Sequence, residues 1–83
     1  MIPIERAARA LSALETQSED RWRDYLPAVV AVVDALHEPS EFMQEAGGEI
    51  FRTYNPHHAE FALQSDAANC WRLMIDAMRK GNF

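Results

Sequence analysis

Residues 22–37 read WRDYLPAVVAVVDALH and make up the most apolar stretch of this chain of 83 residues. The valines between positions 29 and 33 favour a strand, but the phase of the large apolar residues favours a helix. Pro27 lacks a backbone N–H and should kink this helix or break it near residue 26. The stretch therefore predicts a helix over about 20–37, kinked at Pro27, at the centre of the fold. At about 100° per residue, one arc of about 140° holds its large apolar residues, namely Trp22, Tyr25, Leu26, Val29, Val30, Val33 and Leu36.

The residues before this stretch predict a first helix over about 3–16. Pro3 suits a first turn, where a backbone N–H has no partner within the helix. Glu5 and Arg9 form a favourable i,i+4 pair, and Ser12 lies outside the apolar arc. That arc spans about 120° and comprises Ile4, Ala7, Ala8, Leu11 and Leu14.

Ser40 is a good N-cap and predicts a third helix over about 40–54. The apolar residues of this segment stay in phase across Gly47 and Gly48, although two glycines cost about 2 kcal/mol relative to alanines. The alternative is a helix that ends at Ala46 and is followed by an extended segment. In a continuous helix, the two glycines let a neighbouring backbone approach closely.

The last third of the chain predicts two further helices, over about 56–64 and 66–80. Asn55 can cap the first of them, with Pro56 in its first turn. Ser65 and Asp66 open the second, because both residue types favour the start of a helix. Gly81 suits the position that follows its end.

Together these segments predict an all-α fold, a small bundle or orthogonal array of four to five helices. The predicted helices run over about 3–16, 20–37, 40–54, 56–64 and 66–80, and they form a single helical domain over 1–83. The predicted core consists of the large apolar residues on their stripes, namely Leu11, Trp22, Leu26, Val29, Val33, Leu36, Met43, Ile50, Trp71, Met74 and Met78.

Composition and charge exclude several classes of protein. The chain has 13 acidic and 8 basic residues and a net charge of -5, whereas nucleic-acid binders usually show a basic face. Its uncharged runs are much shorter than the roughly 20 apolar residues that a membrane span needs. The single cysteine permits no internal disulfide, and the N-terminus does not resemble a signal peptide. We therefore expect a cytoplasmic protein with no nucleic-acid or membrane partner.

Three pieces of the chain resemble a known group of proteins: WRDYLP at 22–27, EPSE at 38–41 and WRLMID at 71–76. The group consists of small uncharacterised bacterial proteins from alphaproteobacterial genomes, sometimes associated with prophage regions. The resemblance extends from Ile4 to about Met78, and it implies a short, complete, all-helical intracellular protein. It implies no activity and no catalytic residue.

The one polar cluster with metal-ligating residue types is His57, His58 and Glu60. On a helix, His57 and Glu60 would share a face and could bind one metal ion, although a catalytic zinc site needs three protein ligands. A solvent-exposed first turn explains the same residues, because no HExxH or CxxC pattern accompanies them. Cys70 falls on an apolar stripe, as a small buried residue would. The sequence therefore indicates no catalytic residue, no metal and no cofactor.

Residues 34–49 carry five acids and no lysine or arginine. Three of these acids fall on one predicted helical ridge. Such an acidic edge is either a solvated face or a docking edge for a basic partner. The candidate interaction residues are Asp34, Glu38, Glu41, Glu45 and Glu49.

We expect first a non-enzymatic protein–protein interaction module that forms a homodimer or a higher homo-oligomer. A domain of this size has a thin core, which self-association enlarges. The helix over 20–37 is apolar beyond a single stripe, which leaves a second surface for a partner. The residues that widen it are Ala28, Ala31, Val32 and Ala35.

Two alternative functions remain open at this point. One is an acidic regulatory partner, antitoxin-like or an anti-regulator, which docks a basic protein through the 34–49 edge. The other is a metal or small-ligand site around His57, His58 and Glu60.

Overall fold

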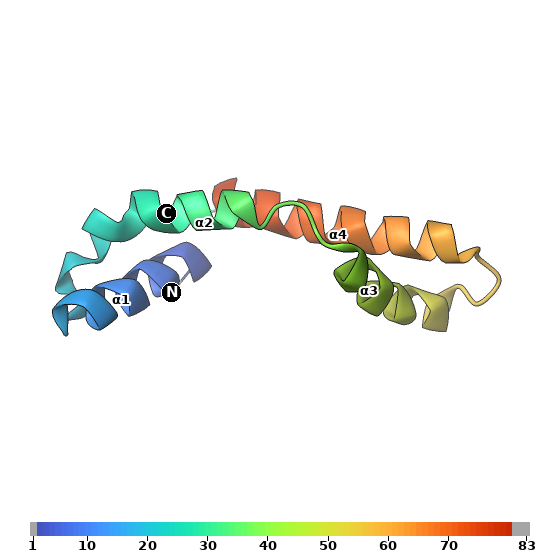
Figure 1. Cartoon of the computed structure of the whole chain (residues 1–83), viewed down its shortest axis with the longest axis horizontal. Coiled ribbons are helices and arrows are strands. Elements are labelled where there is room, and N and C mark those ends of the chain that lie inside the picture. Colours follow the sequence, from blue (N-terminus) through green and yellow to red (C-terminus); the bar gives the residue numbers. More distant parts are fainter. Residues whose placement is uncertain (1, 81–83) are drawn as a thin grey trace. The chain divides into compact units, whose positions relative to one another are not determined.

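The computed structural model describes residues 2–80, and all regular structure in this range is helical (Figure 1). The prediction of an all-α fold is therefore confirmed. In chain order the elements are α1 (Pro3–Thr16), the 3-10 helix η1 (Glu19–Tyr25), α2 (Leu26–Ala35), α3 (Glu41–Tyr54) and α4 (Glu60–Lys80).

The first helix, α1, has the predicted bounds, with Pro3 as its first residue. It ends at Thr16; the next residue, Gln17, donates its N–H to the Ala13 carbonyl and has a left-handed backbone (φ 62) that turns the chain out of the helix. This bond satisfies one of the free carbonyls that every helix end leaves. The predicted pair of Glu5 and Arg9 is also present, with 2.8 Å between Arg9 Nε and Glu5 Oε2.

The segment predicted as one kinked helix over 20–37 is broken at the predicted point. Ser18 caps η1 by accepting a hydrogen bond from the Asp20 N–H (3.1 Å). η1 ends at Tyr25, and α2 then begins at Leu26 with Pro27 in its first turn. A first turn is where proline removes no hydrogen bond.

The third helix, α3, is continuous across its two glycines, so the alternative of a helix that ends at Ala46 is wrong. The side chain of Ser40 caps it by accepting a hydrogen bond from the Met43 N–H (3.2 Å). The close packing of Gly47 and Gly48 against α4 offsets the propensity cost of the two glycines.

The two helices predicted over 56–64 and 66–80 are in fact one helix, α4, which begins at Glu60, so Asn55 and Pro56 do not open a helix as predicted. Ser65 and Asp66 lie in its interior and cap nothing. Ser and Asp in a helix interior cost only a few tenths of a kcal/mol relative to the average residue. The helix also buries Leu63 and Ala67 on the two sides of this point. The prediction for Gly81 lies outside the described residues.

The described residues form two compact units. Unit 1 comprises residues 2–36 and 75–80, and unit 2 comprises residues 37–74. Both units therefore take part of α4. The single domain over 1–83 stays a prediction.

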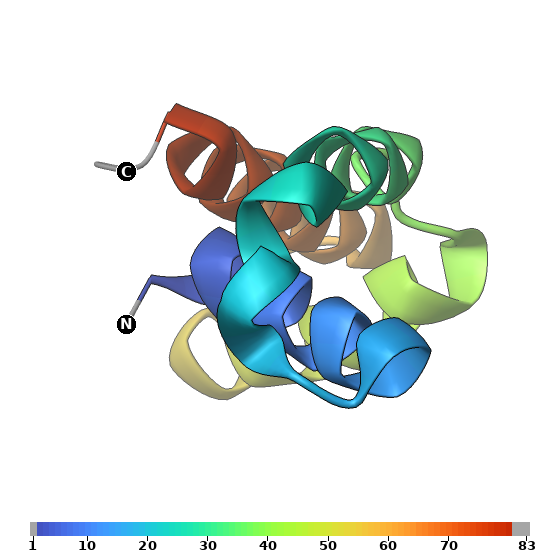
Figure 2. The ribbon, with the colours of Figure 1, turned by 90° about the vertical axis from the view of Figure 1, so that its left-hand side faces the viewer.

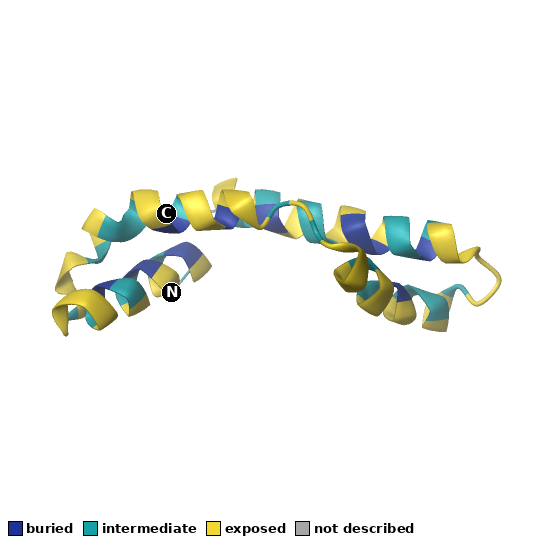
Figure 3. Ribbon diagram, in the orientation of Figure 1, coloured by how far each residue is buried: buried dark blue, intermediate teal, exposed yellow. Residues whose placement is uncertain are grey.

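In unit 1, α1 lies against η1 and α2 (Figure 2). The buried side of α1 faces these elements (Figure 3). It includes Ser12, which was expected outside the apolar arc, whereas Leu14 is 75% exposed. Ser12 is buried because its hydroxyl donates a hydrogen bond to the Ser18 carbonyl (2.6 Å), which ties α1 to the start of η1. The buried residues of unit 1 are Ile4, Ala8, Ser12, Val29, Val33 and Ile75.

Two further contacts hold unit 1 together. Two guanidinium groups lie over the Trp22 ring, those of Arg9 at 4.9 Å and Arg23 at 4.4 Å from the ring centroid. Cations over an indole face are attracted to its π system. Arg79 of α4 pairs with Asp34 of α2, with 2.6 Å between Nε and Oδ1.

In unit 2, α3 packs against α4 through its glycines. A Cβ atom on Gly47 would lie 2.8 Å from the Ala67 Cβ, closer than real Cβ atoms approach one another. A glycine is therefore required at this crossing, as expected from close backbone approach. Leu63, Ala67 and Ala68 of α4 are buried, and so is Gly48.

The predicted core divides into three groups. Val29 and Val33 are buried, while Leu11, Trp22, Leu26, Trp71 and Met78 are half-buried. The other four are exposed, so they do not belong to the core of the single chain. These exposed residues are Leu36, Met43, Ile50 and Met74. The helical phase identifies an apolar face, but it does not say which face a neighbouring helix covers.

Candidate functional site

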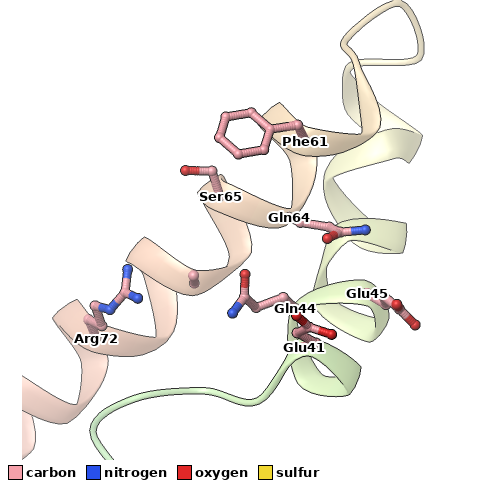
Figure 4. A pocket seen from close by; sticks show the side chains of 8 residues that line it. Glu41, Gln44, Glu45, Phe61, Gln64, Ser65 and Arg72 are labelled. Atoms are coloured by element: carbon pink, nitrogen blue, oxygen red, sulfur yellow. The ribbon is translucent and has the colours of Figure 1, made fainter.

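A groove of about 440 Å³ lies between α3 and α4 in unit 2 (Figure 4). Gln44 reaches into it from α3, and the side chains of Phe61, Ser65 and Arg72 project from α4. The full lining is Glu41, Gln44, Glu45, Phe61, Gln64, Ser65, Ala68 and Arg72. Its polar groups suit hydrogen bonding to a polar segment of a partner rather than burial of an apolar ligand.

Arg72, at one end of the groove, is held by a carboxylate. Its Nη2 lies 2.9 Å from Glu38 Oε1, and its Nε lies 3.1 and 3.2 Å from the two oxygens. The hydrogen bonds from Arg72, and then that from His37 (2.8 Å), hold the pKa of Glu38 below its usual value. Arg72 is therefore already engaged within the chain and is not a free anion-binding group.

The predicted cluster of His57, His58 and Glu60 does not form a helical metal site. Both histidines lie in the turn before α4, where the His58 N–H donates to the Asn55 carbonyl (3.1 Å). Glu60 is the first residue of α4, and its carboxylate is engaged by Gln64 (3.1 Å) and by Arg52. These hydrogen bonds hold the pKa of Glu60 below its usual value. Within residues 2–80, no group of three or more His, Cys, Asp or Glu could hold a metal ion.

Cys70 is exposed, so the prediction of a small buried residue is wrong. Its Sγ lies 3.9 Å from the Sδ of Met74, one turn further along α4. The two side chains share the outward side of the helix because residues four apart are neighbours on its surface.

The five acids predicted as one interaction edge are divided between the two units and differ in their ion pairs. Asp34 belongs to unit 1, where it pairs with Arg79. In unit 2, Glu38 pairs with Arg72 and Glu49 pairs with Arg52. Glu41 and Glu45 are exposed and have no ion pair among the described residues. The arginines that pair with these acids lie outside residues 34–49, so the run of acids alone did not predict the ion pairs.

The outer face of α2 is exposed and carries no charge. Its residues are alanines and Val32, which is 59% exposed. The one charged residue of α2, Asp34, lies beside this face and is paired with Arg79. Figure 3 shows the exposed side of α2 turned away from α1. We call this surface, made of Ala28, Ala31, Val32 and Ala35, the alanine face.

A second exposed apolar surface lies on α3. Phe42 is 79%, Ile50 64% and Tyr54 79% exposed, and Ala46 is exposed between them. We call these four residues the apolar row of α3. Their common helical phase was predicted, but Ile50 was expected in the core and is exposed. The packed side of α3 is the one that carries Gly47 and Gly48, where a close backbone approach was expected.

No protein-family model, curated protein or solved structure matches this chain. Within residues 2–80, no helix is both long enough and apolar enough to span a membrane.

Proposed function

We propose that this protein is a small protein–protein interaction module that self-associates through the alanine face of α2. The observation that carries this proposal is an uncharged helix side left open to solvent. A helix that is apolar all round normally has both sides covered, and α2 has one side covered by its own unit. Extended exposed apolar surface commonly marks an interaction site.

A second copy of the chain is the occupant that suits this face. A two-fold axis places the same surface patch on both sides of a dimer contact, so the patch must be complementary to itself. A surface without charge meets this condition because it brings no like charges together. The short side chains of Ala28, Ala31 and Ala35 also let two helix backbones approach closely.

The size of the alanine face sets the expected affinity of self-association. α2 has 10 residues, which correspond to a length of about 15 Å. The alanine face alone is therefore smaller than a standard interface of about 800 Å² per partner. We expect a dissociation constant in the micromolar range, about 1–100 μM.

Sedimentation equilibrium tests this proposal. The chain should show the mass of two or more copies at about 100 μM and dissociate on dilution. Val32→Glu should weaken the association about tenfold or more, because it places a charge in the contact. Leu14→Glu is the matched control, since Leu14 is also an exposed aliphatic residue and lies outside the alanine face.

Two results would contradict the proposal. One is a mass of a single chain for the unmodified protein at about 100 μM. The other is an association that Leu14→Glu weakens as much as Val32→Glu does.

A further inference from the structure

We infer that the apolar row of α3 binds a basic amphipathic helix of a second protein. This inference concerns a different surface from the alanine face and does not depend on self-association. It rests on three observations in unit 2: an exposed row of large apolar side chains, a helix orientation that keeps this row outside, and unpaired acids along one edge.

The apolar row has the geometry of a helix-binding surface. Phe42, Ala46, Ile50 and Tyr54 follow one another at intervals of four residues and are all exposed. At 1.5 Å per residue the row is about 18 Å long, which matches three to four turns of a partner helix. A hollow of about 240 Å³ at its start, lined by Phe42, Glu45, Ala46 and Glu49, offers room for a side chain of the partner.

The orientation of α3 keeps this row on the outside. The side of α3 that carries Gly47 and Gly48 is held against α4, and Phe42 and Ala46 lie on the far side of the helix from this contact. Only glycine allows the contact with Ala67, so no other side of α3 can take the place of the packed one. The packing of α3 against α4 therefore leaves the apolar row exposed in the folded chain.

The edge of the row is negatively charged. Glu45 lies about 60° around the helix from Phe42, and it has no ion pair among the described residues. Glu41, one turn earlier, is also exposed and unpaired within that part of the chain. Arg52 is the one basic residue of α3, and Glu49 and Glu60 already hold it. The surface thus combines apolar contact with net negative charge.

This combination favours a basic partner over a second copy of the chain. If two copies paired antiparallel through this row, about a two-fold axis perpendicular to the helices, Glu45 of one copy would approach the acidic edge of the other. Like charges across an interface oppose association, whereas lysines or arginines beside an apolar stripe complement the acids.

Binding of two designed peptides to the whole chain tests the inference. Both are labelled 18-residue amphipathic helices with the same leucine stripe, and they carry either lysine or glutamate beside it. Fluorescence anisotropy at about 0.15 M salt should show the leucine–lysine peptide binding about tenfold more tightly than the leucine–glutamate peptide. High salt should reduce this difference, because exposed charges are screened.

Variants of the two parts of the surface locate the binding. Glu41→Gln with Glu45→Gln should weaken binding of the lysine peptide about threefold to tenfold and leave the glutamate peptide unchanged or tighter. Phe42→Ser with Ile50→Ser should weaken both peptides about tenfold or more. These residues are exposed, and circular dichroism checks that each variant keeps its helix content.

Matched controls change the same residue types elsewhere. Glu15→Gln with Asp66→Asn removes two exposed acids on α1 and α4, and Leu14→Ser with Leu73→Ser removes two exposed leucines on the same two helices. The inference is overturned if these controls weaken the lysine peptide as much as the α3 variants, or if both peptides bind equally. It is also overturned if Phe42→Ser with Ile50→Ser reduces the sedimentation mass of the free chain, because a second copy then occupies the row.

Discussion

Ser12 shows how one small polar residue can hold two elements together. It is fully buried, and its hydroxyl donates to the Ser18 carbonyl at 2.6 Å. Thr16 donates to the same carbonyl at 2.9 Å. Two hydroxyl groups of α1 therefore help to fix the turn between α1 and η1.

We expect Ser12→Ala to lower the free energy of unfolding by about 1 kcal/mol, because a buried hydrogen bond is lost. Urea denaturation followed by circular dichroism measures the change. Ser65→Ala is the control, because the Ser65 hydroxyl forms no hydrogen bond among the described residues and alanine favours a helix interior. Equal unfolding free energies for Ser12→Ala and the unmodified chain would contradict this role of Ser12.

The ion pair of Glu38 predicts a dependence of stability on pH. Arg72, first, and His37 lower the pKa of Glu38 below its ordinary value of 4.5 in the folded chain. The stabilisation is therefore present above about pH 4.5 and is lost as the pH falls through the lower, folded pKa. We expect the free energy of unfolding to fall on acidification, and Glu38→Gln to reduce this dependence.

Denaturation at a series of pH values between about 2 and 7 measures this dependence, and an NMR titration of the Glu38 carboxyl carbon follows its pKa directly. Glu15→Gln, at an exposed acid without an ion pair among the described residues, should keep the original dependence. A Glu38 titration midpoint at or above 4.5 would contradict the ion pair.

At the scale of elements, the contact between α3 and α4 predicts opposite effects at two adjacent glycines. A Cβ on Gly47 would lie 2.8 Å from Ala67 Cβ, whereas a Cβ on Gly48 would lie 3.6 Å from its nearest neighbours. We expect Gly47→Ala to destabilise the chain by about 1–3 kcal/mol despite its better helix propensity. Gly48→Ala should stabilise it by about 0.5–1 kcal/mol.

Thermal and urea denaturation of the two variants compare these effects. Ala67→Gly in the background of Gly47→Ala should recover part of the lost stability, because it removes the atom that the new Cβ meets. A Gly47→Ala variant as stable as Gly48→Ala would show that α3 and α4 do not approach so closely.

Local signals in the sequence predicted the elements wherever one residue decides the backbone. Pro27 marked the break before α2, and Ser40 marked the start of α3. Ser65 and Asp66 misled the prediction because capping residue types also occur in helix interiors. The packed side of α3 was not predicted, since it is chosen by the absence of a side chain at Gly47 rather than by an apolar residue.

For the whole molecule, the candidate surfaces could be predicted only in part. The predicted helix over 20–37 is apolar beyond a single stripe, and this pattern indicated the alanine face. The pattern lies within one short stretch, so it can be recognised without knowing the residues that pack against it. Whether an acid is paired depends on residues far along the chain: Glu38 pairs with Arg72, and Asp34 pairs with Arg79. Such pairings follow from the fold of each unit and leave no pattern in a local stretch of sequence.

The division of α4 between the two units also bears on the order in which they fold. Unit 2 is one continuous stretch, residues 37–74. Unit 1 instead joins distant parts of the chain, because Ile75 is buried in it and Arg79 pairs with Asp34. Contacts between distant residues require a larger loop to close, so we expect unit 2 to fold faster than unit 1.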